Sequence, residues 1–198
     1  DCILRIQEAF YLSCKYRTPA IVLGDKHLGE SNYTFDQLKK SQLKAVSYPV
    51  DRASSYEHNE AGYTVEDAKS VVQGQERRIK KIALIEKEVQ KFNPISIFGQ
   101  GKNLIVGWGS TKGAILDALP ELKSFRFLQI SYLKPFPKEM VSREIKKSRK
   151  VILIENSATG ALADVITEQT GLFVKNKVLK YDGRPFTPEY IIDKIKKP

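Results

Sequence analysis

The sequence predicts an α/β protein whose second half is a three-layer domain built on a mostly parallel β-sheet. Two observations lead to this prediction. From Asn103 onward, short apolar runs alternate with helical segments of about ten residues, which is typical of a parallel sheet covered by helices on both faces. Between Tyr33 and Gly74 the chain is instead polar and irregular, which separates this domain from a shorter first part.

The elements of the second half follow from the spacing of their apolar residues. Short, nearly continuous apolar runs are typical of strands buried on both faces. Apolar residues at helical spacing are typical of helices that pack on a sheet. We therefore predict strands within 103–109, 125–133, 150–155 and 171–181, and helices within 110–119, 138–148, 160–170 and from Pro188 to about Lys197.

The run YDGRPFTPEYI, residues 181–191, predicts a rigid turn that leads into the last helix. Gly183 tolerates a positive φ, and Thr187 followed by Pro188 is a typical helix start. Arg184 is the residue of this turn whose side chain is suited to bind a ligand or a partner, because a guanidinium pairs with a carboxylate or a phosphate. It is a candidate interface or ligand residue, and the alternative is an arginine that pairs with a nearby acid and fixes the tail.

Fewer helices and strands are predicted for the first part of the chain. Residues 3–16 have the apolar spacing of a helix with one buried face, and the run TPAIVLGD, residues 18–25, predicts a short strand buried on both sides. Helical spacing returns in residues 75–92. Because one helix and one strand cannot form a core alone, and because the chain opens on Asp1, we interpret it as starting inside a domain whose earlier part is absent.

The composition limits the possible classes of function. The chain has 198 residues, 41% of them hydrophobic, and a formal net charge of +10. No apolar run approaches the roughly 18 residues that cross a bilayer, and no leader peptide opens the chain, so we expect a cytoplasmic protein without a membrane partner. The lysines are mixed with acids and lack interleaved aromatic residues, so we expect no nucleic-acid partner. Two alternative interpretations of the positive net charge remain, a solvated basic surface and docking to an acidic protein.

Two cysteines, Cys2 and Cys14, lie in the same predicted helix. At a rise of about 1.5 Å per residue they are roughly 18 Å apart, too far for a disulfide. Without a CxxC pair or a His/Cys cluster, the chain is expected to hold no iron–sulfur cluster and no zinc. The acids and the histidine of YEHNEAGYTVED have no recognised metal spacing, so we predict an ordered polar arm there and no metal ligands.

Two turns join predicted strands to predicted helices. GWGSTKG resembles a dinucleotide-binding loop only in part, because Lys112 stands where the third glycine is needed. A tight turn in which Ser110 or Thr111 caps the helix is therefore favoured. In ENSATGALAD, Glu155 and Asn156 are candidates for an interface or a ligand, because loops at the carboxyl ends of parallel strands line a crevice; a capping or turn role is the alternative.

The loop GDKHLGES contains three ionisable candidates, Asp25, His27 and Glu30. A histidine beside carboxylates suits proton transfer, since it titrates near neutrality. No serine or cysteine nucleophile pattern accompanies these residues. The favoured interpretation is a structural loop that hydrogen-bonds a neighbouring segment.

Several segments together resemble one family. They are EAFYLSCKYRTPAIVLGDKHLGES, EHNEAGYTVEDAKSVVQGQERRIKKI, IVGWGSTKGAILDAL with YLKPFPKE, and YDGRPFTPEYI. Their order and spacing resemble the alpha subunits of 2-oxoacid:ferredoxin oxidoreductases, particularly the 2-oxoglutarate and broad 2-oxoacid type. The resemblance implies that residues 1–45 are the end of a thiamine-diphosphate-type pyrimidine domain, 46–93 a connecting arm and helix, and 94–198 a transketolase C-terminal-like domain.

The resemblance also implies an activity. Members decarboxylate a 2-oxoacid on thiamine diphosphate, transfer the acyl group to coenzyme A and pass electrons through an iron–sulfur cluster to ferredoxin, with a beta subunit as partner. The family's cofactor-activating and substrate-reading motifs belong to a part that precedes Asp1, so we assign no catalytic and no cofactor-binding residue. We expect the chain to bind no cofactor and to be inactive alone. The alternative is a free-standing basic module that docks an acidic electron carrier.

Overall fold

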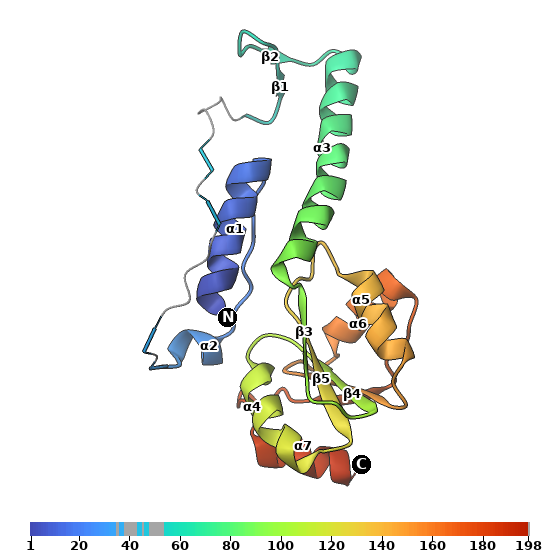
Figure 1. Ribbon diagram of the computed structural model, residues 1–198. Helices are drawn as coiled ribbons and strands as arrows, with labels where there is room; N and C mark the ends of the chain where they lie inside the picture. Colours follow the sequence, from blue (N-terminus) through green and yellow to red (C-terminus); the bar gives the residue numbers. More distant parts are fainter. Residues whose placement is uncertain (35, 38–42, 45, 48–53, 198) are drawn as a thin grey trace. The chain divides into compact units, whose positions relative to one another are not determined.

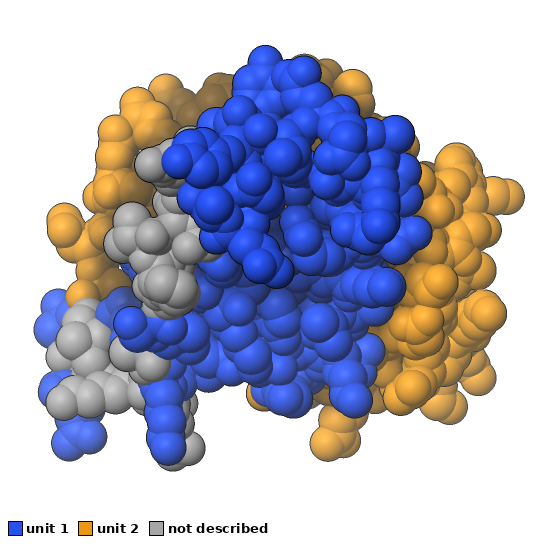
Figure 2. Space-filling model, turned by 90° about the horizontal axis from the view of Figure 1, so that it is seen from above, with its two compact units in different colours: residues 1–22, 34–92 blue, residues 23–33, 93–198 orange. Residues whose placement is uncertain are grey.

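The computed structural model describes residues 1–34, 36–37, 43–44, 46–47 and 54–197. The chain divides into two compact units, which Figure 2 colours separately. The first unit comprises residues 1–22 and 34–92, and the second comprises residues 23–33 and 93–198.

The second unit is built on a five-stranded sheet with the order β3-β5-β4-β6-β7. Strands β4, β5, β6 and β7 run parallel to one another, and β3 pairs antiparallel with β5 at one edge. This confirms the predicted α/β class and the mostly parallel sheet. The strands are β3 (Ile95–Phe98), β4 (Asn103–Gly107), β5 (Phe125–Ile130), β6 (Val151–Glu155) and β7 (Asn176–Leu179).

Helices cover both faces of this sheet, so the unit has three layers (Figure 1). Side chains alternate between the faces along each strand. Leu104 and Val106 therefore belong to the apolar cluster under α5 and α6, whereas Ile105 between them belongs to the cluster under α4 and α7. The helices are α4 (Thr111–Ala118), α5 (Lys138–Lys146), α6 (Ala161–Thr170) and α7 (Pro188–Lys196).

Each strand and helix predicted for the second half is present, with differences of a few residues at the ends. Strand β3 is not among the elements predicted from the sequence. This strand has only four residues, and it follows the helical region directly except for the turn Asn93-Pro94. It completes the sheet because Ile95 pairs with Ile130 and Phe98 pairs with Phe127.

The first unit contains two long helices, α1 (Cys2–Tyr16) and α3 (Ala68–Val89). A short 3-10 helix (Gln90–Phe92) follows α3. The strands β1 (Glu57–His58) and β2 (Thr64–Val65) form a small antiparallel hairpin. Helix α3 begins seven residues before the predicted start at 75, because the Asp67 side chain accepts a hydrogen bond from the Ser70 backbone N–H and caps it. Gly74 lies inside this helix, where a Cβ would overlap the Glu57 carboxylate.

A polar network joins α1 to α3. The Glu88 carboxylate accepts hydrogen bonds from the Tyr11 hydroxyl at 2.9 Å, from Lys15 Nζ at 2.9 Å and from Lys91 Nζ at 3.0 Å. These donors, Lys15 above all, lower the pKa of Glu88 to about 2, and the same contact raises the pKa of Lys15. The Arg5 guanidinium adds a hydrogen bond to the Phe92 carbonyl at 3.1 Å.

The buried strand predicted for residues 18–25 is wrong for this structure. Helix α1 ends at a left-handed Arg17, and the following residues form no strand. Ile21 is 84% exposed and Val22 52% exposed. A strand is stable only when neighbouring strands pair with it, and no described segment of this chain pairs with this one.

Candidate functional site

The candidate site is the edge of the sheet at which the four parallel strands end. Ligands of α/β folds bind beyond the carboxyl ends of the strands, where the connecting loops meet. Here β6 and β7 end side by side, since Glu155 pairs with Leu179 and the Lys180 N–H donates to the Glu155 carbonyl at 3.2 Å. The loops that carry Asn156 and Arg184 therefore leave the sheet at the same edge.

Glu155 occupies a central and buried place on this edge. Its side chain is at the end of β6, and the residue is 4% exposed. One carboxylate oxygen accepts a hydrogen bond from Trp108 Nε1 at 3.2 Å, and both accept from the Leu162 backbone N–H, at 3.1 and 3.3 Å. The carboxylate thus caps helix α6, whose N-cap residue is Gly160. Glu155 therefore joins two loops of this edge.

The loop after Glu155 is ordered by its own contacts. Ser157 Oγ accepts hydrogen bonds from the backbone N–H groups of Thr159 and Gly160, at 3.2 and 3.0 Å. Gly160 has a φ of 81°, and a Cβ there would meet the Lys177 side chain. Asn156 is exposed at the start of this loop. Among the candidates of this loop, Asn156 is therefore the one that faces solvent.

The loop of Asp25 is attached to the same unit through the turn before α4. Asp25 caps the short helix α2 (Lys26–Glu30), because its Oδ1 accepts from the Leu28 N–H at 2.8 Å. Its Oδ2 accepts from the Ser110 hydroxyl. Both carboxylate oxygens of Asp25 are thus engaged in structural hydrogen bonds. This contact has no local sequence signal, since the two residues are separated by 85 positions.

His27 and Glu30 lie on α2 and are exposed. The His27 carbonyl accepts a hydrogen bond from the Ser31 hydroxyl at 2.5 Å, and a Glu30 carboxylate oxygen lies 3.8 Å from Lys26 Nζ. The described contacts do not join the side chains of Asp25, His27 and Glu30 to one another. The arrangement does not form a proton-transfer pair.

Arg184 lies in the exposed turn after β7. Its backbone N–H donates to the Asp182 carboxylate at 3.0 Å, and Lys180 pairs with the same carboxylate and lowers the pKa of Asp182. Within residues 54–197, the ion pairs found do not include the Arg184 guanidinium. The tail is instead fixed by Phe186, which is 7% exposed, and by Thr187, whose hydroxyl accepts from the Tyr190 N–H at 3.3 Å.

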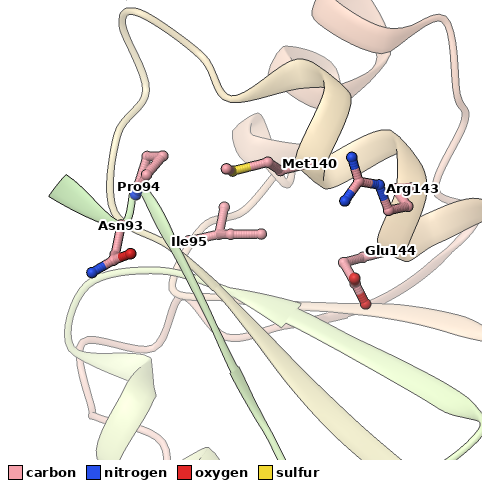
Figure 3. Close-up of a pocket in the computed structure, with 6 residues that line it drawn as sticks. All are labelled: Asn93, Pro94, Ile95, Met140, Arg143 and Glu144. Carbon is pink, nitrogen blue, oxygen red and sulfur yellow. The ribbon is translucent and has the colours of Figure 1, made fainter. Parts of the chain in front are cut away.

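A small cavity of about 200 Å³ lies beside α5 (Figure 3). Glu144 lines this cavity, and its carboxylate already forms ion pairs, with Arg126 Nε at 3.4 Å and with Lys147 Nζ at 2.6 Å. Binding sites for cofactors of drug-like size are about 300–1,000 Å³, so this cavity does not fit thiamine diphosphate. It is lined by Asn93, Pro94, Ile95, Met140, Arg143 and Glu144.

The described residues do not fit a metal or an iron–sulfur cluster. Cys2 is exposed and Cys14 is half-buried, both on α1, whereas such clusters use about four thiolates. Nowhere in the described ranges do three or more His, Cys, Asp or Glu residues gather as metal ligands. Helices long and apolar enough to cross a membrane are likewise absent from the part of the chain that the structure describes.

Sequence comparison identifies relatives over nearly the whole chain, although no protein-family model matches it. Subunit alpha of 2-oxoacid:ferredoxin oxidoreductase 1 from Sulfurisphaera tokodaii is 32% identical over 211 residues, which cover 90% of this chain and 34% of the relative. The chain is a homologue of 2-oxoacid:ferredoxin oxidoreductase alpha subunits. The alpha subunit from Saccharolobus solfataricus is 28% identical over 225 residues, which cover 95% of this chain and 36% of the relative.

The fold of this chain is similar to that of a solved structure. The 2-oxoglutarate:ferredoxin oxidoreductase from Magnetococcus marinus, determined with 2-oxoglutarate, coenzyme A and succinyl-CoA bound, has a TM-score of 0.63. The match covers 91% of this chain and 32% of that chain at 22% identity, which supports the fold alone. The chain thus spans about a third of the length of its relatives, with 34% and 36% covered in the two above.

Proposed function

We propose that the chain is a portion of the alpha subunit of a 2-oxoacid:ferredoxin oxidoreductase and that it supports assembly instead of supplying catalytic groups. The observation that carries the proposal is the 32% identity across 90% of the chain. The whole enzyme would oxidatively decarboxylate a 2-oxoacid with thiamine diphosphate, form an acyl-CoA and reduce ferredoxin. The chain's own chemistry agrees with a supporting role, because the buried acids of the described residues are all engaged in structural contacts: Glu8, Glu88, Glu144 and Glu155.

The proposal includes a division of the chain. Residues 1–45 would be the end of a pyrimidine-type domain, 46–93 a connecting arm and helix, and 94–198 a transketolase C-terminal-like domain. Two findings support it. The sheet and both apolar clusters of the second unit lie within residues 95–195, and the apolar residues Ile21 and Val22 are exposed, as expected for a segment that packs on a further part of a larger protein.

The cofactors would be held elsewhere in the complex. Calorimetric titration of the 198-residue chain with thiamine diphosphate and Mg²⁺ tests this directly. We expect no binding heat, because the described residues supply no cluster of ligands for the Mg²⁺ that accompanies the diphosphate. Tight binding with one cofactor per chain would contradict the proposed role.

A beta subunit is the proposed partner, and the exposed residues Asn156 and Arg184 are the proposed contacts. The polypeptide that contains this chain is co-expressed with its beta subunit, and their dissociation constant is measured for Arg184→Glu and for Lys69→Glu as a control of equal charge change. We expect Arg184→Glu to weaken the complex about tenfold, since a reversed rim charge repels its partner. Equal affinities of the two variants would remove Arg184 from the interface.

The alternative, a free-standing basic module for an acidic electron carrier, stays a prediction. The net charge of +10 is compatible with both functions. They differ in the need for the beta subunit: a module of this kind would bind a reduced or oxidised acidic carrier alone, whereas the oxidoreductase portion would act only within the assembled enzyme.

A further inference from the structure

The edge of the sheet opposite the candidate site carries a row of basic side chains. A base directly precedes each of three parallel strands: Lys102 before β4, Lys150 before β6 and Lys175 before β7. Before β5 the base is Lys123, one residue further back. With Arg149 and with Lys146 at the end of α5, these residues form what we call the basic edge.

Strand pairing places these bases side by side. The Arg149 N–H donates to the Lys102 carbonyl at 3.0 Å, and the Leu104 N–H donates to the Lys150 carbonyl at 2.8 Å. Asn103 pairs with Phe125 and Ile152 pairs with Asn176, so Lys123 and Lys175 begin the strands on either side. Adjacent strands are about 4.8 Å apart, and the row therefore extends over roughly 15 Å.

The acids nearby do not neutralise the row. Glu144 is buried and engaged by Arg126 and Lys147, and Glu121 pairs with Lys196 at 3.3 Å. Glu168 is an exposed acid near the end of α6. In the part of the chain that the structure describes, the salt bridges found include none of the six residues of the basic edge.

Local folding does not explain most of these bases. Cations at the end of a helix offset the helix dipole, which accounts for Lys146. The other five lie before strands, whose dipoles are small, so they gain no such stabilisation. Neighbouring like charges on the exposed edge repel one another instead. A ligand of opposite charge would offset that repulsion.

We propose that the basic edge docks an acidic face of a partner protein. The exposed aromatic Phe173, 68% accessible, lies just before Lys175 and suits the apolar anchor that protein interfaces place among charged rims. A single-stranded nucleic acid needs several stacking aromatics, and a duplex needs a helix or ribbon that enters a groove; the basic edge offers neither. The positive row would steer the partner and orient it.

The test compares two triple variants of the 198-residue chain. The first is Lys102→Glu, Arg149→Glu and Lys175→Glu on the basic edge. The control is Lys69→Glu, Lys80→Glu and Lys87→Glu on α3, three exposed lysines that give the same change in net charge. The probe is fluorescently labelled poly-L-glutamate, and a single-stranded DNA with the same number of charges serves as the competing ligand. Dissociation constants are measured by fluorescence anisotropy, and circular dichroism checks that each variant is folded.

We expect the wild-type chain to bind poly-glutamate more tightly than the DNA, the edge variant to lose about tenfold in affinity for it, and the control less than about threefold. Absence of wild-type binding, equal losses in the two variants, or tighter binding of the DNA through this edge would each overturn the proposal. Melting of the edge variant at an unchanged or higher temperature is expected, because the substitutions remove like-charge repulsion. No oxidoreductase activity enters these measurements, so their outcome is independent of the proposed function.

Discussion

Trp108 Nε1 donates a hydrogen bond to Glu155 Oε1 at 3.2 Å and joins the ends of β4 and β6 across 47 residues of sequence. The same carboxylate caps α6 through the Leu162 N–H. One side chain thus connects two strand-to-helix turns, and the shape of the carboxyl edge depends on it.

Removing this carboxylate is expected to destabilise the second unit. Glu155→Ala leaves the buried Leu162 N–H and the half-buried Trp108 Nε1 without this acceptor and should lower the free energy of unfolding by about 1–3 kcal/mol. Denaturant unfolding monitored by Trp108, the single tryptophan of the chain, measures it. Asn156→Ala, an exposed neighbour, is the control and should change stability by less than about 0.5 kcal/mol. Wild-type stability of the Glu155 variant would show that the cap and the Trp108 contact are unimportant.

Alanine substitutions at two glycines test two different effects: a close backbone contact and helix propensity. A Cβ at Gly101 would overlap the backbone of Ser124, whereas a Cβ at Gly113, inside α4, meets nothing within 4 Å. Gly101→Ala is therefore expected to lower the melting temperature, because the backbone must shift. Gly113→Ala is expected to raise stability by about 0.5–1 kcal/mol through helix propensity. Thermal unfolding of both variants checks the pair, and equal effects would contradict the close approach at Gly101.

The buried ion pair of Arg126 and Glu144 is expected to be sensitive to truncation on one side. Arg126 donates to the Gly101 carbonyl and to Ser148 Oγ, both at 2.7 Å, and its Nε lies 3.4 Å from Glu144. Arg126→Met removes one of the two cations at Glu144 and leaves the Gly101 carbonyl and Ser148 Oγ without this donor, so it should cost about 1–3 kcal/mol. Lys123→Met is the exposed control. If adding Glu144→Leu to Arg126→Met restores no stability, the loss does not come from the broken ion pair with Glu144.

The network around Glu88 predicts a pH dependence for the packing of α1 on α3. The pKa of Glu88 is lowered from 4.5 to about 2, mainly by Lys15, so the folded state favours the carboxylate. The resulting stability is fully present above pH 4.5 and is lost as the pH falls toward 2. Glu88→Gln should be less stable than wild type by about 1–3 kcal/mol at neutral pH, and the difference should shrink over that window.

Thermal unfolding by circular dichroism at a series of pH values measures this effect. Glu86→Gln, on the same helix and exposed, is the control and should show no such trend. A Glu88 difference that stays constant down to pH 2 would contradict the assigned network.

The second half of the fold could be predicted because its signals are local. Buried strands such as β6 show as nearly continuous apolar runs, and Thr187-Pro188 marks the start of α7 by residue type alone. The four-residue β3 has no comparable period. Helix α3 starts earlier than predicted because Asp67 caps it, and it continues through Gly74, where the Glu57 carboxylate leaves no room for a Cβ.

Tertiary contacts explain the remaining differences. Residues 18–25 have the composition of a buried strand, but burial depends on partners that sequence does not show, and Ile21 is 84% exposed. At the candidate site, the predicted capping alternative describes Glu155 well, yet nothing local indicates that Trp108 or Ser110 is the partner of a distant acid. Such pairings arise from strand order, which is a property of the whole sheet.

The measurement that tests the central proposal most directly is enzymatic. The polypeptide that contains this chain is purified with its beta subunit and a reconstituted iron–sulfur cluster, and reduction of a viologen dye is measured with common 2-oxoacids. The account predicts reduction that requires thiamine diphosphate, coenzyme A and the beta subunit together, and none from the 198-residue chain alone. Complete inactivity of the assembled, cluster-loaded complex with every 2-oxoacid tested would contradict it.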